Sequence, residues 1–371
     1  MRITILQGAF LALPPHNGGA VEKRWYEMAK IFAARGHTVT HVSRHLPGLK
    51  EKEEIDGVTH LRIKGYDTPR SLKVLKWYDL LYSLRCLRQL PDADILITNT
   101  FWSPILAPKR AGAIIVDVAR LPKGQLCLYK KAKCFRANSS VVLNAILQES
   151  AAFQNRSIQI PNPLPFHVEA DHPQFSKEKR ILYTGRIHPE KGVHLLIEAF
   201  KRLITEHSEL SDWHLDLVGP WEVAGGGGGR DYRDHLMGLF THPNIHWVEP
   251  IFDTQKLNQY YERSSIFVYP SLAEKGETFG LAPLEAMAWG AVPIVSQIKC
   301  FQDFIEHGRN GIIFDHRSSN PAEQLSEAIL HVASIDRNNM IQEALKVRTS
   351  HSVEKVSDEF LDAFVHFLNE K

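Results

Sequence analysis

The sequence predicts an α/β protein built from two doubly wound, Rossmann-like domains. The chain has 371 residues, which is about the length of two ordinary domains. Short β-branched runs alternate with helical segments in both halves, a pattern typical of parallel sheets covered by helices. A proline-rich stretch without periodicity, near residues 162–178, separates the two series and indicates a domain boundary.

The first domain is predicted to span residues 1–165. It begins with a strand at 2–10 and a helix at 21–36, whose apolar residues recur at helical spacing and which ends at Gly36. The further strands are expected at 37–43, 93–100, 112–119 and 133–140, and the further helices at 71–90 and 141–151. The order of these segments favours a parallel sheet.

The second domain is predicted to span residues 166–350, and residues 351–371 should form an amphipathic C-terminal helix. Its strands are expected at 179–186, 213–219, 245–251, 265–271 and 291–296, and its helices at 193–205, 254–264 and 283–290. Five glycines at 225–229 predict a mobile solvent loop, with a phosphate cradle as the alternative.

Composition excludes several classes of protein. Apolar residues make up 44% and charged residues 23% of the chain, so global disorder is not expected. Four cysteines without CxxC pairs or zinc spacing indicate free thiols in a reducing compartment. Gln7 and Gly8 interrupt the first apolar run, which favours a first strand over a signal peptide. No apolar run is long enough to predict a membrane span.

Charge is divided unevenly along the chain. Residues 1–165 hold 24 Lys and Arg against 12 Asp and Glu, a net charge of +12, and the remainder carries −10. A basic first half suggests an anionic surface or substrate for that half, with chance asymmetry as the alternative.

Three loops at strand ends are candidate ligand sites, because ligands of doubly wound sheets bind at the carboxyl ends of the strands. Gly18 and Gly19 precede the first helix, so bare amides could approach an anion there. Arg186 and Lys191 follow the first strand of the second domain and would suit a diphosphate, or else are solvated surface charges.

The third loop runs from residue 275 to 296, and Pro283 is placed to start a helix. Glu277 lies before Gly280, and Glu285 lies in the expected first helical turn. A favourable interaction with the helix dipole would account for Glu285 but not for Glu277.

Together these motifs resemble the retaining glycosyltransferases of the GT-B fold, glycosyltransferase family 4. Glu277 and Glu285 form an E-x7-E motif with Phe279-Gly280 after the first acid, downstream of GRIHPEKG at 185–192 and of the GG pair in the first loop. The resemblance covers most of the chain. It implies two Rossmann-like domains facing across a cleft, with the C-terminal helix returning to the first domain.

The resemblance also implies roles for individual residues. Glu285 would bind the ribose of a nucleotide sugar, and the amides of Gly280, Leu281 and Ala282 would face the diphosphate and the sugar. Glu277 would contact the donor sugar near the reacting carbon, while Arg186 and Lys191 would stabilise the leaving diphosphate. The remaining donor contacts would come from Gly18, Gly19, Phe279 and, in the loop that resembles the family's nucleobase site, Ile251.

The sequence departs from the family pattern at two places. Lys299-Cys300 and Gln302-Asp303 replace a glycine pair and Pro-Glu. Asp117 occupies the strand end where the family often has a histidine near the reacting sugar, so Asp117 would take over a polar contact to the sugar. Arg120 and Lys123 nearby could hold a charged acceptor. A structural role remains the alternative for all of them.

The resemblance therefore predicts transfer of a hexose from a UDP- or GDP-linked sugar to a glycan or lipid-linked acceptor, in surface polysaccharide, lipopolysaccharide or glycolipid synthesis. No cofactor and no metal are expected, because the DAD run at 92–94 reads as a turn before a strand. A nucleotide-sugar epimerase or hydrolase and a catalytically silent nucleotide-sugar-binding subunit are the alternatives.

The expected location is the cytoplasm, and no nucleic-acid partner is predicted. The basic amphipathic helix at 71–90 suggests attachment to an anionic membrane surface. In the alternative, that helix packs its apolar face on the sheet and exposes its cations to water.

Overall fold

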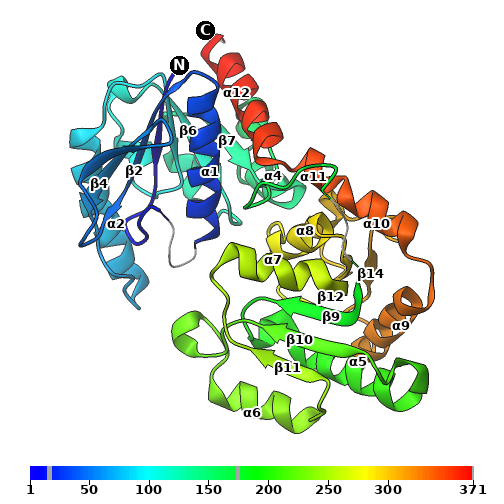
Figure 1. Ribbon diagram of the computed structural model, residues 1–371. Helices are drawn as coiled ribbons and strands as arrows, with labels where there is room; N and C mark the ends of the chain where they lie inside the picture. Colours follow the sequence, from blue (N-terminus) through cyan, green and yellow to red (C-terminus); the bar gives the residue numbers. More distant parts are fainter. Residues whose placement is uncertain (15–18, 173–175, 370–371) are drawn as a thin grey trace. The chain divides into compact units, whose positions relative to one another are not determined.

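A computed structural model describes residues 1–14, 19–172 and 176–369 and divides the chain into two compact units (Figure 1). Unit 1 comprises Met1–His167 and His351–Lys371, and unit 2 comprises Val168–Ser350. Each unit is an α/β layer structure with its own sheet. Among the described residues, no helix combines the length and apolar character needed to cross a bilayer.

Unit 1 contains an eight-stranded sheet in the order β3-β4-β2-β1-β5-β6-β7-β8. The strands are β1 (Arg2–Leu6), β2 (Thr38–His45), β3 (Lys52–Ile55), β4 (Val58–Lys64), β5 (Ile95–Thr98), β6 (Ala113–Val118), β7 (Ala132–Ala137) and β8 (Ser157–Gln159). The helices are α1 (Ala20–Ala34), α2 (Leu72–Gln89), α3 (Ser103–Leu106), α4 (Ser140–Glu149) and α12 (Val353–Asn369). All neighbouring pairs are parallel except β3 with β4.

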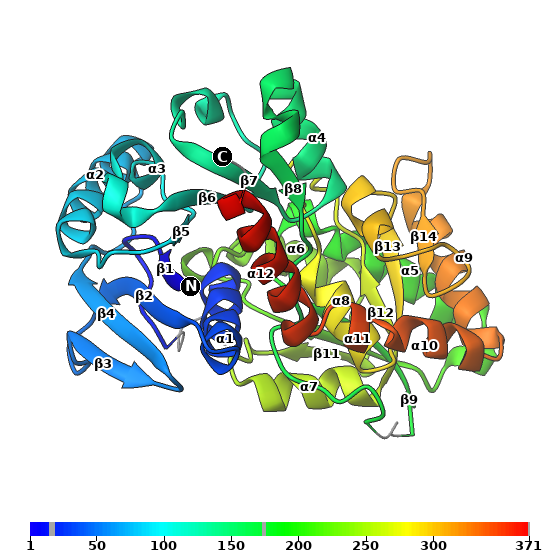
Figure 2. The same ribbon diagram turned by 90° about the horizontal axis from the view of Figure 1, so that it is seen from above.

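Helix α12 packs against α1 in unit 1 (Figures 1 and 2). Phe360 lies edge-on to Trp25 at 5.1 Å between ring centroids, and Phe364 lies edge-on to Phe32 at 5.9 Å. These side chains are buried in one apolar cluster with Ile3 and neighbouring strand residues. The predicted return of the C-terminal helix to the first domain is confirmed.

Unit 2 contains a six-stranded parallel sheet in the order β11-β10-β9-β12-β13-β14. The strands are β9 (Glu178–Thr184), β10 (His214–Val218), β11 (Ile245–Val248), β12 (Ser264–Tyr269), β13 (Val292–Ser296) and β14 (Ile312–Phe314). The helices are α5 (Val193–Glu206), α6 (Arg230–Leu239), α7 (Thr254–Arg263), α8 (Leu281–Ala288), α9 (Pro321–Ser334), α10 (Asn338–Leu345) and α11 (Val347–Ser350). The predicted fold class, two parallel-sheet Rossmann-like domains, is confirmed.

The glycine run at 225–229 forms a turn that backbone hydrogen bonds tie to neighbouring residues. The amide of Gly228 donates to the carbonyl of Ile187 at 2.8 Å, and that of Gly229 to the carbonyl of Trp221 at 2.8 Å. A Cβ on Gly227 would lie 2.2 Å from the backbone of Trp221. The glycines are therefore needed for close backbone approach, which composition alone does not reveal.

Candidate functional site

The strand order of unit 2 places its ligand side between β9 and β12. Chain order reverses there, because β9 is followed by β10 on one side and β12 lies on the other. Ligands of doubly wound sheets bind at such a switch point, outside the carboxyl ends of the strands. The loops that leave β9 and β12 carry Arg186 and Lys191, and Ser271 and Glu277, respectively.

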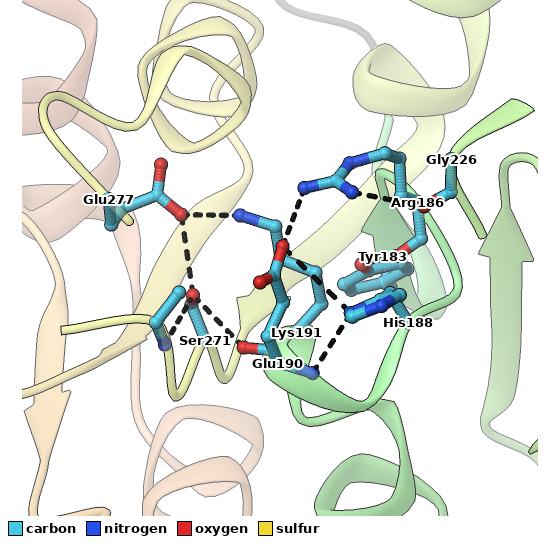
Figure 3. Close-up of polar contacts among 9 residues, drawn as sticks. Tyr183, Arg186, His188, Glu190, Lys191, Gly226, Ser271 and Glu277 are labelled. Carbon is cyan, nitrogen blue, oxygen red and sulfur yellow. Dashed lines mark hydrogen bonds and ion pairs between the residues drawn. The ribbon is translucent and has the colours of Figure 1, made fainter. Parts of the chain in front are cut away.

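Lys191 and Glu277 meet at the centre of this site (Figure 3). The Lys191 Nζ atom donates to Oε2 of Glu277 at 2.7 Å, although the two residues are 86 positions apart. The hydroxyl of Ser271 donates to the same oxygen at 3.3 Å. Both charged side chains are about nine-tenths buried, so this ion pair is poorly screened by solvent.

Arg186 lies beside this pair and is held from two sides (Figure 3). One guanidinium nitrogen donates to the carbonyl of Gly226 at 3.0 Å, and another donates to Glu190 at 2.6 Å. The buried hydroxyl of Tyr183 donates to the carbonyl of Arg186 at 2.7 Å. Arg186 remains 44% exposed, so its other N–H groups can reach a ligand.

The two loops are tied together by backbone contacts. The amide of Leu272 donates to the carbonyl of Glu190 at 2.8 Å. Gly192 has φ 67°, and a Cβ there would lie 2.0 Å from the carbonyl oxygen of Pro270. The glycine that ends the GRIHPEKG motif is therefore required for the β9 loop to pass close to the end of β12.

Helix α8 begins beside Glu277, at Gly280. Gly280 has φ 89°, and a Cβ there would lie 2.4 Å from the ring of Phe301. Phe279 is buried and packs on Phe304. The backbone amides of Leu281 and Ala282 form the first turn of the helix, so this end of α8 can donate to an anion.

Glu285 lies two residues further into α8 than the sequence suggests. The helix starts at Leu281 rather than at Pro283, so Glu285 is its fifth residue and no acidic residue occupies the first turn. The predicted placement in the first turn is wrong, because the left-handed Gly280 starts the helix earlier. The hydroxyl of Tyr261 donates to Glu285 at 2.9 Å and lies 2.7 Å from Oγ1 of Thr184. Glu285 is thus linked to the end of β9 through a buried tyrosine.

The phenol of Tyr269 belongs to the same electrostatic environment. Burial, followed by the negative charge of Glu277, raises the pKa of Tyr269 well above its ordinary value. Lys191 Nζ lies 5.2 Å from the centroid of this ring, a favourable cation–π position. Tyr269 therefore stays neutral, with its ring beside Lys191 and a hydrogen bond to Glu277.

Two other predicted features lie in unit 2 loops. Ile251 is half-buried between β11 and α7, two residues before Asp253, which caps α7 by accepting from the amide of Lys256 at 3.0 Å. Cys300 is buried in the 3₁₀ turn Lys299–Asp303, and burial raises the pKa of its thiol. A buried protonated thiol is a packing residue and not a nucleophile.

Unit 1 has a cavity of about 530 Å³ at its own switch point, between β1 and β5. The cavity is lined by the end of β6 and by residues that follow β1, β5 and β6, among them Gly19, Glu22, Asn99, Asp117 and Arg120. Gly19 precedes α1 with φ 93°. Lys123 is exposed and is not among the lining residues, and Gly18 lies outside the described residues.

Asp117 is engaged in a buried ion-pair network at the floor of this cavity. Its carboxylate accepts from Arg136 at 2.8 Å, from the indole of Trp25 at 2.9 Å and from the guanidinium of Arg24. Burial opposes ionisation, but Arg24 and Arg136 outweigh it and hold the pKa of Asp117 below its ordinary value. Both carboxylate oxygens are used within the protein, so the geometry favours the structural alternative for Asp117.

Glu22 is a cavity residue that motif reasoning missed. It lies in the first turn of α1 and faces Gly19. Burial raises the pKa of its carboxyl. The sequence signal for Glu22 is an acid three residues after a glycine at a helix start. This pattern is common at helix starts in general, so it does not by itself indicate a cavity residue.

The DAD run is not among the residues that line the unit 1 cavity. Asp94 precedes β5 and binds Arg2 through its guanidinium at 2.7 Å. That end of the strand is opposite to the carboxyl end. Among the described residues, no group of three or more His, Cys, Asp and Glu side chains could hold a metal ion.

Comparison with known proteins agrees with this architecture. Residues 168–347 match the family described as glycosyl transferases group 1. Spore coat protein SA of Bacillus subtilis is 23% identical over 367 residues, covering 89% of each chain. The capsular polysaccharide biosynthesis glycosyltransferase CapM of Staphylococcus aureus is 23% identical over 188 residues, covering 51% of this chain and 46% of CapM.

Solved structures share the whole fold. The sucrose-phosphate synthase of Thermosynechococcus elongatus superimposes with a TM-score of 0.76 at 17% identity, over 100% of both chains. Anabaena HepE in complex with UDP superimposes with a TM-score of 0.71 at 15% identity, over 99% of this chain and 100% of HepE. Residues 168–347 are therefore similar to glycosyl transferases group 1, and the two α/β units have the fold of GT-B glycosyltransferases.

Proposed function

We propose that this protein is a retaining glycosyltransferase that moves a hexose from a nucleotide diphosphate sugar to a glycan or lipid-linked acceptor. One observation carries the proposal. Two loops that are far apart in the sequence place Lys191, Glu277 and Arg186 together, beside the first turn of α8. Two cations and a helix N-terminus suit a diphosphate.

The chemistry follows from these groups. Transfer breaks the bond between the anomeric carbon and the diphosphate oxygen and forms a bond to an acceptor oxygen, whose proton is released. Negative charge grows on the leaving diphosphate, where Arg186 and Lys191 stabilise it most in the transition state. No metal is needed in this scheme, because the two side chains supply the positive charge.

The acids have separate roles in the proposal. Glu277, held by Lys191 and Ser271, contacts the donor sugar. Glu285, held by Tyr261, binds the ribose, and the loop around Ile251 contacts the base. The donor is UDP- or GDP-linked, and the complex of Anabaena HepE with UDP supports the former.

Relatives support a role in surface polysaccharide or glycolipid synthesis. They include CapM and the lipopolysaccharide 1,2-N-acetylglucosaminetransferase of Salmonella typhimurium. The four cysteines form no disulfide, which supports a cytoplasmic location.

Release of nucleoside diphosphate, measured with and without acceptor, tests the proposal. Release should depend on the acceptor, whereas a hydrolase would not need it and a silent subunit would release nothing.

Lys191→Ala should slow transfer by about 10²-fold or more, equivalent to about 2–4 kcal/mol. Lys275→Ala, which alters an exposed lysine of the same loop, should retain the full rate. A full-rate Lys191→Ala enzyme would refute the assignment.

A further inference from the structure

Helix α2 presents apolar residues on two opposite faces. Its inner face carries Tyr82, Cys86 and Leu87, which are buried in the core of unit 1. Asp79, also buried, accepts from the amide of Phe101 at 3.1 Å. These contacts hold the helix against the rest of unit 1 and leave several of its other apolar residues exposed.

The opposite side, which we call the outer face of α2, consists of Lys73, Val74, Trp77, Leu84 and Arg88. These positions fall on one side of a helix with 3.6 residues per turn. Trp77 is 57% exposed, and Val74 and Leu84 are each 38% exposed. Leu72, at the start of the helix, is 77% exposed. Large apolar side chains gathered on one exposed face are typical of a binding surface.

Apart from the buried Asp79, the charged side chains of α2 are all basic. Lys73 and Arg88 lie on the outer face, Lys76 and Arg85 flank it, and Arg70 precedes the helix. Asp79 is the helix's acidic residue, and it points into the core. The alternative, in which α2 packs its apolar face on the sheet and exposes its cations to water, describes the inner face but does not account for the exposed Val74, Trp77 and Leu84.

We propose that the outer face of α2 lies on an anionic lipid bilayer. Trp77, Val74 and Leu84 would enter the interfacial region, and the surrounding lysines and arginines would contact acidic headgroups. The aromatic and aliphatic side chains match the apolar interior of the bilayer, and the cations that border them match its acidic headgroups. The inference goes beyond sugar transfer, since bilayer binding requires no donor or acceptor.

Attachment through α2 would also bring the unit 1 cavity close to the membrane. Phe101 lines that cavity, and its amide is the group that Asp79 binds. The ring of Phe101 lies 4.7 Å from Nζ of Lys76. An acceptor confined to the bilayer would therefore meet the cavity through the same loop that seats α2.

Flotation of the full chain with vesicles tests the proposal. One set contains phosphatidylcholine alone, and the other also contains phosphatidylglycerol. We expect binding to the second set at low salt and progressive release as salt rises, because the Debye length falls from about 10 Å at 0.1 M to about 3 Å at 1 M. A protein that stays with neither set at low salt would overturn the proposal.

Variants of exposed residues locate the surface without disturbing the core. Lys73→Gln combined with Arg88→Gln should weaken partitioning roughly 25-fold, at about fivefold per cation. Trp77→Ser should weaken it about tenfold or more. Val365→Ser and Lys355→Gln, exposed changes on α12 in the same unit, should bind as the parent protein does.

Two further outcomes would overturn the proposal. Trp77→Ser that still floats with anionic vesicles would mean that another surface binds lipid. A concentration-dependent dimer that Trp77→Ser abolishes, without vesicle binding by the parent, would assign the face to a second copy of the chain. Nucleoside diphosphate release with a water-soluble acceptor should be measured on the same variants. Release without vesicle binding would contradict the lipid proposal alone, whereas no release from the parent protein would contradict the proposed function.

Discussion

The two units place charged clusters at equivalent positions, beyond the central strands of their sheets, but use them differently. In unit 2, Arg186 is half-exposed beside the buried ion pair of Lys191 and Glu277. In unit 1, Arg24, Asp117 and Arg136 are buried together below the cavity. A charged cluster at a strand end therefore identifies a ligand site only when some of its N–H or carboxylate groups are free to contact a ligand.

The largest expected effect that separates the units is on stability. Asp117→Asn removes the charge that pairs with Arg24 and Arg136 and leaves two buried cations without a counter-ion. We expect the free energy of unfolding to fall by about 3–5 kcal/mol, measured by urea denaturation. Asp94→Asn, which breaks an exposed pair with Arg2, should cost no more than about 1 kcal/mol.

The same variant should change the pH dependence of stability. The pKa of Asp117 is lowered in the folded protein. Its stabilisation is therefore present above the ordinary carboxyl pKa of 3.8 and is lost as pH falls through the lower folded value. Asp117→Asn should flatten this acid limb of the unfolding curve. An unchanged acid limb would show that the network is not a source of stability.

In unit 2 the effect should instead appear in kinetics. Glu277→Gln should mainly lower kcat, by about 10²-fold, because its contact lies near the reacting carbon. Glu285→Gln should mainly raise the donor KM, by about tenfold, since ribose is remote from the bond that forms. Steady-state rates over a range of donor concentrations distinguish the two, and the reverse pattern would exchange their roles.

A smaller effect is expected at Glu190, which binds Arg186 where a diphosphate would approach. Glu190→Gln keeps an oxygen that can accept from Arg186 but removes a negative charge that repels the donor. We expect the donor KM to fall by up to about fivefold, as for an exposed charge pair. Glu198→Gln, in the adjacent helix α5, is the matched control. A higher KM in Glu190→Gln would show that its charge is needed to orient Arg186.

The smallest expected effect is that of metal removal. Because Arg186 and Lys191 supply positive charge in the proposed site, treatment with a chelator should leave the transfer rate unchanged. Activity that disappears with chelator and returns with manganese would contradict the metal-independent proposal.

Local pattern predicted much of the fold because each buried strand and each amphipathic helix is a continuous segment. The β3–β4 hairpin was missed, since its charged residues dilute the period-two pattern. The edge strand β14 has three residues, and α9 and α10 follow it as helices that were not predicted. Neither a short edge strand nor the packing of a glycine run is visible without its neighbours.

The candidate site shows the same limit. Arg186, Lys191 and Glu277 were identified because each belongs to a compact motif. The Tyr261–Glu285 bond joins residues 24 positions apart, and the Arg24–Asp117 pair joins residues 93 positions apart. No local spacing specifies such partners. The occupied carboxylate of Asp117 could therefore be recognised only in three dimensions.

The return of α12 to unit 1 has a consequence for biosynthesis. The chain leaves unit 1 after His167 and re-enters it at His351, so the whole of unit 2 is translated before Phe360 and Phe364 exist to complete the core around Trp25 and Phe32. Because domains fold largely as units during synthesis, unit 2 should reach its native structure while unit 1 still exposes an unfinished apolar surface. The nascent chain would therefore be most open to chaperones and proteases in its first half, although that half is made first.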